Sequence, residues 1–560
     1  MAQLFLLIPL AVAFWYWQKT SKALGMSLGN QMWGTFWRTW VYFCLLNIPI
    51  GLLIRILQLN RLLPFIDSSP GPVHTFFYST LVVIGTVYIA LVARYAAGKC
   101  KMPGNNVTPQ TSHLGGALVA DASAQQKANA EQVRSLMANK KENEYLPNVL
   151  LAGLGCPLES EARHFKIMGT TGSGKSVAIR SMLSFVQQRA PHTGDRVVIA
   201  DPDGGYLARF YNPGRGDVIL NPFDARSAHW ALFKELRNPY DADQFAASLV
   251  PDLGGDNSVW AGYARTLVSS TIQALYASGD VTTRDLYDAI SVMNNAELGE
   301  LLSHTSASRF FDGAEDTLGS IRTNASQALR ALSYLSRDDA FSMTEWIRGG
   351  RGWLFMPYKA DQIAALKPII TTWMRTAIFS TLSLNEGDSR LWFVIDELDA
   401  LGKIDGLSDA LTRLRKFGGR VVLGFQSIGL IDTIYGKGYG ATITENAGNT
   451  LILRCSSSDG GGTSRFASSL VGKRKVRRLM ESSTQSSGSS SGGVHSGRSS
   501  GYSEQIVEED AVMPSEIEQL PDMNGYLKFA TLPAWNRISF AYDGLPVKAT
   551  AFEPSQMVHA

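Results

Sequence analysis

The segment at 169–176, GTTGSGKS, limits the fold of this chain more than any other feature. It fits the pattern GxxxxGK[ST] in full, follows the strand-like run FKIM and precedes a helix-prone stretch. Its glycines let backbone N–H groups approach phosphates, Lys175 can reach the β- and γ-phosphate oxygens, and Ser176 can hold Mg²⁺. The sequence therefore predicts a nucleotide-binding α/β domain. The expected nucleotide-binding residues are Gly169, Thr170, Thr171, Gly172, Ser173, Gly174, Lys175 and Ser176.

The second half of such a site is expected at 391–397, LWFVIDE. A buried strand that ends in two acids is the Walker B pattern. Asp396 would bind Mg²⁺ through water and Glu397 would polarise the attacking water. Together with Lys175 and Ser176, these acids indicate an ATPase that uses ATP and Mg²⁺. Lys175 and Asp396 are 221 residues apart, far more than a bare nucleotide-binding core needs, so the spacing requires an inserted unit.

Apolar strand-like runs alternate with helical patterns along most of the chain, which predicts a parallel sheet with helices on its faces. The stretch between 240 and 345 is an exception, because its pattern is helical with few strand-like runs. Residues 481–503 are almost all Ser and Gly, a composition typical of a flexible loop. The expected organisation is a connector at 101–145, a nucleotide-binding domain at 146–239 and 346–545, an inserted all-α domain at 240–345, the loop at 481–503 and a tail at 546–560.

The first hundred residues are expected to form a membrane anchor. Charged residues make up 18% of the chain, below the roughly 25% of soluble domains. Apolar stretches at about 38–58 and 76–94 are long enough to span a bilayer, and 4–17 is a shorter candidate for a third span. Basic residues precede the first span and follow the second, which predicts that both ends are cytoplasmic. The alternative is a buried helical hairpin.

Several further residues are candidates for function. Gln426 ends the strand expected at 420–426, where it would sense the γ-phosphate or be a solvated strand end. Arg413 and Arg415 would supply positive charge to a neighbouring subunit's ATP site or form an exposed basic helix end. Lys403 and the basic run at 471–478 are candidates for contacting a polyanion, and an edge strand that resists aggregation explains the run as well. The net charge of +3 is too small to indicate nucleic-acid binding, and four scattered cysteines support neither a zinc site nor a disulfide framework.

The motifs together resemble the type IV secretion coupling proteins, the TraD/TraG family, and within it the TraD proteins of F-type conjugative plasmids. The resemblance covers about 145–543. It rests on GTTGSGKS and on four longer segments, ILNPFDARSAHWALFKEL (219–236), LWFVIDELDAL (391–401), RKFGGRVVLGFQS (415–427) and IEQLPDMNGYLKFATLPA (517–534).

The resemblance implies a RecA-like P-loop domain with an inserted all-α domain, preceded by an N-terminal transmembrane anchor. It implies a homo-hexameric ring at the bacterial inner membrane that delivers DNA and its bound relaxase to the secretion channel, with DNA-stimulated ATP hydrolysis. By motif, Lys175, Glu397, Arg415 and Gln426 are catalytic, with Arg415 as an inter-subunit finger, and Ser176 and Asp396 are metal ligands. Two departures are Gly205, where the family often has Glu, and a short tail where F-type members have a long acidic one.

Other functions share parts of this pattern. The same ATPase domain could serve a protein that recruits protein effectors in place of DNA. The inserted all-α domain, which recognises substrate in the family, would discriminate between these cargoes. A non-hydrolysing scaffold is disfavoured by the intact Lys175, Asp396 and Glu397. A chromosome-segregation motor shares the P-loop but is disfavoured by the family motifs.

Overall fold

The computed structural model describes ten stretches of the chain: 112–139, 148–251, 258–313, 315–338, 340–387, 389–436, 438–457, 462–490, 493–542 and 544–555. The expected membrane segments at 4–17, 38–58 and 76–94 lie outside these residues. Within the described stretches, no helix is both long enough and apolar enough to cross a bilayer.

A ten-stranded sheet organises the described chain. Seven consecutive strands are parallel, and most of their residues are buried, which is why they read as nearly continuous apolar runs in the sequence. In spatial order these strands are β7 (Val218–Ile219), β8 (Trp353–Tyr358), β6 (Asp195–Pro202), β9 (Arg390–Ile395), β10 (Gly419–Phe425), β5 (Phe165–Met168) and β11 (Asn449–Ile452). Three more complete one edge: β14 (Asn524–Lys528), β15 (Trp535–Ser539) and β2 (Val119–Asp121).

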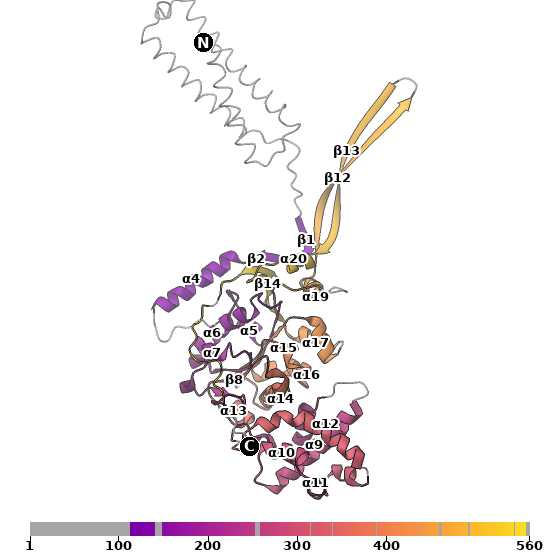
Figure 1. Ribbon diagram of the computed structural model, residues 1–560. Coiled ribbons are helices and arrows are strands. Elements are labelled where there is room, and N and C mark those ends of the chain that lie inside the picture. Colours follow the sequence, from indigo (N-terminus) through magenta and orange to yellow (C-terminus); the bar gives the residue numbers. More distant parts are fainter. Residues whose placement is uncertain are drawn as a thin grey trace, which may run out of the picture. The chain divides into compact units, whose positions relative to one another are not determined.

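Two apolar cores lie on the two faces of this sheet. Alternate residues of β9 show the division, since Phe393 belongs to one core and Trp392 to the other. Helix α6 (Lys175–Thr193) packs into the core that holds Trp392, and α14 (Ile363–Thr381) packs into the core that holds Phe393. The sheet is therefore covered on both faces, as the alternating strand and helix pattern predicts (Figure 1).

Between β7 and β8 the described chain consists of helices and their connections, and Figure 1 shows α9 to α12 gathered together. The helices are α8 (Asp241–Leu249), α9 (Ser258–Ser278), α10 (Thr283–Ser291), α11 (Asn295–Leu301), α12 (Glu315–Leu329) and α13 (Met343–Gly349). Buried Glu235 joins the two ends of this block, because it accepts hydrogen bonds from Trp230 Nε1 at 3.0 Å and from the backbone N–H of Thr344, also at 3.0 Å. The acid lies at the amino end of α13, where the helix dipole favours negative charge.

The Ser/Gly segment differs from the expected loop. Strands β12 (Lys473–Ser490) and β13 (Gly493–Asp510) form an antiparallel ladder from Lys473 opposite Asp510 to Ser490 opposite Gly493 (Figure 1). The flexible loop at 481–503 was expected from the Ser and Gly composition. A β-ladder, however, is held by backbone N–H and C=O groups, which Ser and Gly also carry. β1 (Ser112–Gly116) pairs with the first half of β12.

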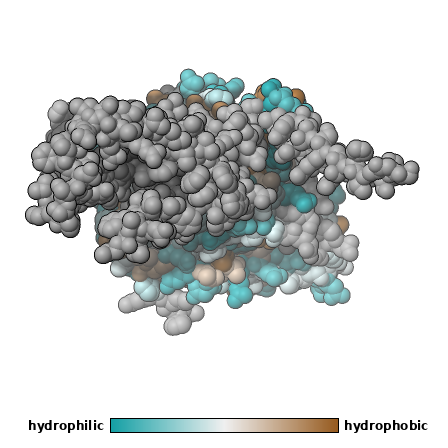
Figure 2. All heavy atoms as spheres, turned by 90° about the horizontal axis from the view of Figure 1, so that it is seen from above, coloured by the Kyte–Doolittle hydropathy of each residue, from teal (hydrophilic) through white to brown (hydrophobic). Residues whose placement is uncertain are grey.

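The basic run at 471–478 is part of this hairpin, and its cations face acids on β13. Arg474 pairs with Glu509 at 2.9 Å, Arg478 reaches the same carboxylate, and Lys473 pairs with Glu508 at 3.6 Å. These cross-strand pairs offset the local positive charge. Seen from above, the described surface in Figure 2 is largely hydrophilic, with apolar residues scattered among the polar ones, as on most protein surfaces.

Candidate nucleotide-hydrolysis site

The loop at 169–176 joins β5 to α6 at the carboxyl edge of the parallel strands. Gly172 and Gly174 have φ angles of +79° and +111°, which side chains rarely adopt, and a Cβ at Gly169 would lie 2.5 Å from Ser173 Oγ. Lys175 is buried, and its Nζ donates to the Gly169 carbonyl at 2.7 Å. The loop thus forms a closed turn around the lysine at the amino end of a helix, which is a natural site for an anion.

Strand β9 brings the Walker B acids to the same edge. Asp396 is buried, and its Oδ2 accepts hydrogen bonds from Ser176 Oγ at 2.6 Å and from the Tyr206 hydroxyl at 2.8 Å. Its Oδ1 is buried and has no hydrogen-bond partner among the described residues. A hydroxyl beside a carboxylate with one free oxygen fits Mg²⁺, which takes few protein ligands and keeps several waters. Among the described residues, no cluster of three His, Cys, Asp or Glu offers a different kind of metal site.

Gln426 lies between the loop and the second Walker B acid. Its Oε1 accepts a hydrogen bond from Thr171 Oγ1 at 3.0 Å, and its Nε2 donates to Glu397 Oε1 at 3.5 Å. Its backbone N–H donates to Asp399 Oδ2 at 3.1 Å. The strand order explains this position, because β10 lies between β5 and β9 and ends at the same edge as both. The side chain is therefore placed to respond to a group bound at the loop.

Burial and neighbouring charges shift the pKa values of the site. Burial lowers the pKa of Lys175, although Asp396 and Glu397 oppose that shift. Burial raises the pKa of Glu397, and the charges of Asp396 and Asp399 raise it further. A carboxylate with a raised pKa holds a proton more readily and suits general-base work at neutral pH.

Two residues of this site were not among the sequence candidates. Asp201, at the end of β6, is fully buried, and burial raises its pKa to about 7 although it accepts the backbone N–H groups of Tyr206 and Leu207. Tyr206 follows and directs its hydroxyl at Asp396. A strand ending in DPDGG was the available signal for Asp201, but nothing in the sequence connects Tyr206 to an acid 190 residues away.

Arg415 is not part of this cluster. It begins the short 3-10 turn Arg415–Phe417, which precedes β10, whereas Gln426 follows the end of that strand. The seven residues of β10 separate the two positions by roughly 20 Å. Arg415 and Arg413 are both exposed. The structure thus brings together Lys175, Ser176, Asp396, Glu397 and Gln426, and leaves Arg415 at the opposite edge of the sheet.

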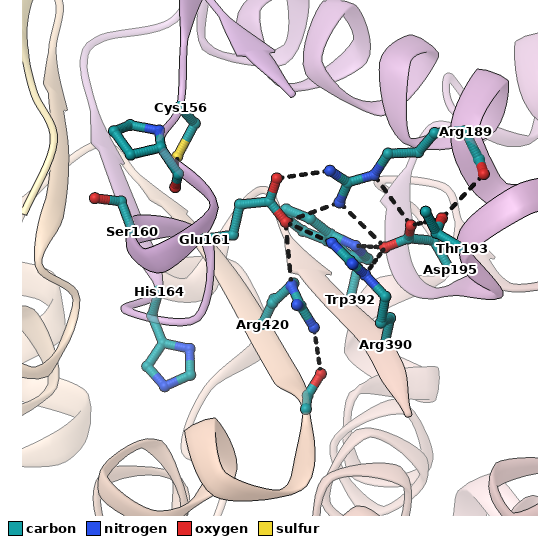
Figure 3. A network of polar contacts seen from close by, with 12 residues as sticks. Cys156, Ser160, Glu161, His164, Arg189, Thr193, Asp195, Arg390, Trp392 and Arg420 are labelled. Atoms are coloured by element: carbon teal, nitrogen blue, oxygen red, sulfur yellow. Dashed lines mark hydrogen bonds and ion pairs between the residues drawn. The ribbon is translucent and has the colours of Figure 1, made fainter. Parts of the chain in front are cut away.

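That opposite edge contains a buried ionic network, which Figure 3 shows. Glu161 accepts two hydrogen bonds from Arg189, at 2.6 and 2.8 Å, and lies within 3.4 Å of both Arg390 and Arg420. Arg189 also donates to Asp195 at 3.0 Å. The network connects the last turns of α6 to the amino ends of β6, β9 and β10. Four of these ionised groups, Glu161, Arg189, Asp195 and Arg420, are buried, and burying them requires this degree of mutual pairing.

Arg420 extends the network toward the turn of Arg415, because its Nη1 donates to the Gly418 carbonyl at 2.7 Å. The Ser389 hydroxyl donates to the Phe417 carbonyl at 2.8 Å, and the Leu391 N–H donates to Gly418 at 3.1 Å. The turn is therefore fixed to β9 and β10 by three hydrogen bonds.

The parallel sheet, the loop that ends in Lys175 and the acids on β9 define a P-loop nucleotide-binding protein of the α/β class. Residues 148–540 match the family described as the type IV secretion-system coupling protein DNA-binding domain. The chain belongs to this family.

Known relatives agree with that assignment. The coupling protein TraD of Escherichia coli (strain K12) is 30% identical over 407 residues, which are 71% of this chain and 55% of TraD. The chain thus matches about half the length of that relative. The conjugative coupling protein TrwBdeltaN70 in its unbound form is 31% identical, with a TM-score of 0.67 over 79% of this chain and 96% of that one. TrwB in complex with ADP and Mg²⁺ is 30% identical, with a TM-score of 0.66 over 79% of this chain and 97% of that one.

Proposed function

We propose that this chain is the coupling ATPase of a conjugative type IV secretion system, which binds DNA with its relaxase and drives their transfer to the channel. The observation that carries this function is the complete hydrolytic cluster of Lys175, Ser176, Asp396, Glu397 and Gln426 within a coupling-protein fold. TrwB has been solved with the ATP analogue ADPNP and with ADP and Mg²⁺, which supports ATP and Mg²⁺ as the ligands of this cluster.

Each residue has a role that its geometry supports. The backbone N–H groups of 169–176 would hold the phosphates, and the ammonium group of Lys175, which lies within this loop, would pair with the β- and γ-phosphate oxygens. Ser176 and Asp396 are the residues that would hold Mg²⁺. When bound, Mg²⁺ neutralises charge that develops on the phosphate oxygens.

Glu397 and Gln426 act on the attacking water. Glu397 orients the water and accepts its proton, and burial, which raises the pKa of Glu397, favours that proton transfer. Gln426 contacts both Thr171 of the phosphate-binding loop and Glu397. Its side chain therefore links the presence or loss of the γ-phosphate to the position of the Glu397 carboxylate.

Arg415 acts in the ATP site of a neighbouring copy, and the assembly is a homo-hexameric ring. The exposed position of Arg415, a strand length away from the chain's own loop, supports action in trans. A guanidinium placed at a transferring phosphoryl group stabilises its charge and increases turnover by orders of magnitude.

The chain is anchored in the bacterial inner membrane by the apolar stretches at 38–58 and 76–94, with 4–17 as a third candidate, and its ATPase domain is cytoplasmic. The basic residues that flank the first two stretches support this orientation. Protein effectors are the second candidate cargo, and the family's description as a DNA-binding domain favours DNA over them.

ATP turnover with and without single-stranded DNA tests the function. The wild-type chain should turn over ATP faster with DNA, and Lys175→Ala should abolish turnover under both conditions. Lys127→Ala, an exposed lysine on α4 (Ser123–Asn139), is the matched control and should behave as wild type. Turnover that is unaffected by DNA would contradict the DNA cargo, and turnover that survives Lys175→Ala would contradict the assigned site.

A further inference from the structure

A hollow lies where the inserted helices meet the nucleotide-binding domain. Its walls come from α8 and α9 of the helical block, from α14, and from the loop that follows α15 (Leu398–Leu401). Its polar lining residues are Ser248, Arg265, Thr371, Arg375, Lys403 and Asp405. Three of these are cations and one is an acid, so the hollow carries excess positive charge.

Arg375 is the most deeply placed of the three cations, with 8% of its surface exposed. Its Nη2 donates to Gln244 Oε1 at 3.2 Å, and its guanidinium lies over the ring of Phe379. Its Nε has no hydrogen-bond partner among the described residues and lies 4.0 Å from Asp405 Oδ2. A guanidinium has five N–H donors, and a buried one is costly unless an anion pairs with it. Asp405 is half exposed and meets this need only in part.

The other two cations of the hollow, Arg265 and Lys403, also line it. Arg265 is fixed by a 2.7 Å hydrogen bond from its Nε to the Val250 carbonyl, which leaves its terminal nitrogens for other partners. Lys403 is exposed, at the rim. Lys367 lies beside the same loop, since a Cβ at Gly402 would be 2.5 Å from its Cε. Positions 367, 371 and 375 of α14 are four residues apart and share one helix face.

We propose that this hollow binds a backbone phosphate of the transported DNA, with Arg375, Arg265 and Lys403 as its ligands. The inference rests on the proposed function for the identity of the cargo. The polar lining favours a phosphate over a base, because three cations meet two hydroxyl side chains there and none of the described lining residues is aromatic.

The position of the hollow connects cargo to hydrolysis. Lys403 and Asp405 lie on the segment between Glu397, which precedes α15, and α16 (Leu407–Leu414), which leads into Arg415. The buried Tyr435 hydroxyl donates to the Gly402 carbonyl at 3.3 Å and accepts the Ile404 N–H at 3.2 Å, so this segment is not a loose loop. A phosphate held by Lys403 therefore acts on the chain segment that carries the Walker B acid.

Binding of fluorescently labelled single-stranded DNA to the full chain, measured by anisotropy over a range of salt concentrations, tests the proposal. Lys403→Gln removes an exposed charge, and we expect it to weaken binding by roughly 3- to 10-fold and to reduce the slope of log affinity against log salt by about one. Asp405→Asn removes the competing anion and should strengthen binding. Lys127→Gln changes net charge equally, away from the hollow, and should leave affinity unchanged.

Arg375→Lys keeps the buried positive charge but has fewer N–H donors, so it should weaken DNA binding. The thermal unfolding midpoint of this variant shows whether the fold is destabilised. Three outcomes would overturn the site. In the first, Lys403→Gln and Asp405→Asn both have the same DNA affinity as the Lys127→Gln control. In the second, both variants bind DNA more weakly than the wild type. In the third, inorganic phosphate at constant ionic strength binds the wild type but not Lys403→Gln and yet leaves DNA binding to the wild type unchanged, which would mark a site for free phosphate. If the wild-type chain itself does not bind DNA, the proposed function fails together with the site.

Discussion

Ser176 donates a 2.6 Å hydrogen bond to Asp396, and this contact joins the phosphate-binding loop to the Walker B strand. Both side chains are proposed to hold Mg²⁺, so this contact places the two halves of the proposed metal site side by side. The remaining oxygen of Asp396, Oδ1, is buried without a partner among the described residues. A buried oxygen without a hydrogen-bond donor is costly, and a cation held at Asp396 would offset that cost.

Asp396→Asn keeps the size of the side chain and removes its charge. We expect ATP turnover to fall on the order of 100-fold or more at millimolar Mg²⁺, because the metal loses its anionic anchor. A Mg²⁺ titration of turnover checks this, with Asp409→Asn as an exposed control on α16. Unchanged turnover at low Mg²⁺ would mean that Asp396 is not the metal anchor.

Tyr206→Phe removes only the hydroxyl that donates to Asp396. A hydrogen bond to a charged group contributes about 1.5–3 kcal/mol, so the Mg²⁺ concentration for half-maximal turnover should rise by roughly 10-fold or more. Excess Mg²⁺ should restore most of the maximal rate, because Tyr206 positions Asp396 and does not touch the substrate. Tyr211→Phe is the matched control, and an equal effect there would exclude a specific role for Tyr206.

Glu397→Gln should reduce turnover by about 100- to 10,000-fold, the range attributed to a general base, while nucleotide binding persists. Burial raises the pKa of Glu397, and the base works only when deprotonated. Wild-type turnover should therefore decline with falling pH, and the decline should begin above the range of an ordinary carboxyl group. A pH–rate profile measures this, and a profile that is flat down to pH 4.5 would argue against Glu397 as the base.

A ring made only of Arg415→Ala should lose ATP turnover, because each site lacks the arginine from its neighbour. A ring made only of Lys175→Ala should lose it because each site lacks its own loop lysine. Mixed in equal amounts, the two inactive variants should recover part of the activity, since some interfaces then combine an intact loop with an intact Arg415. Turnover of the mixture against each variant alone is the measurement. Arg413→Ala is the neighbouring control, and a mixture as inactive as its components would contradict action in trans.

His164 should make stability depend on pH. Burial lowers its pKa to about 4, and its ring accepts the Val421 N–H at 3.1 Å and contacts the Leu411 carbonyl at 2.8 Å. The unfolded chain binds a proton near pH 6.5 that the folded chain excludes, so the free energy of unfolding is unaffected above that pH. It falls between pH 6.5 and 4 by up to about 1.4 kcal/mol per pH unit.

Thermal midpoints measured across that interval test the histidine. His164→Asn does not titrate, and Asn tolerates the positive φ angle of 55° at this position. We expect its midpoint to vary less with pH than that of the wild type. Parallel curves for the two proteins would assign the pH dependence to other groups.

The features that the sequence predicts here are those encoded by contiguous residues. GTTGSGKS and LWFVIDE each carry their chemistry within eight positions, so the loop and the Walker B strand could be recognised without a structure. Tyr206 could not, because its contact with Asp396 depends on β6 and β9 being neighbours. The long β12–β13 ladder was missed for a different reason, since Ser and Gly side chains give no sign of backbone pairing.

The network around Glu161 has a mechanical consequence. Arg189 ties it to the helix that begins at Lys175, and Arg420 ties it to the carbonyl of Gly418, beside the turn that begins at Arg415. The network thus connects the helix that follows the phosphate-binding loop to the turn that begins at Arg415. The proposed action of Arg415 in a neighbouring site would therefore involve movement of the whole α/β domain and not of the turn alone.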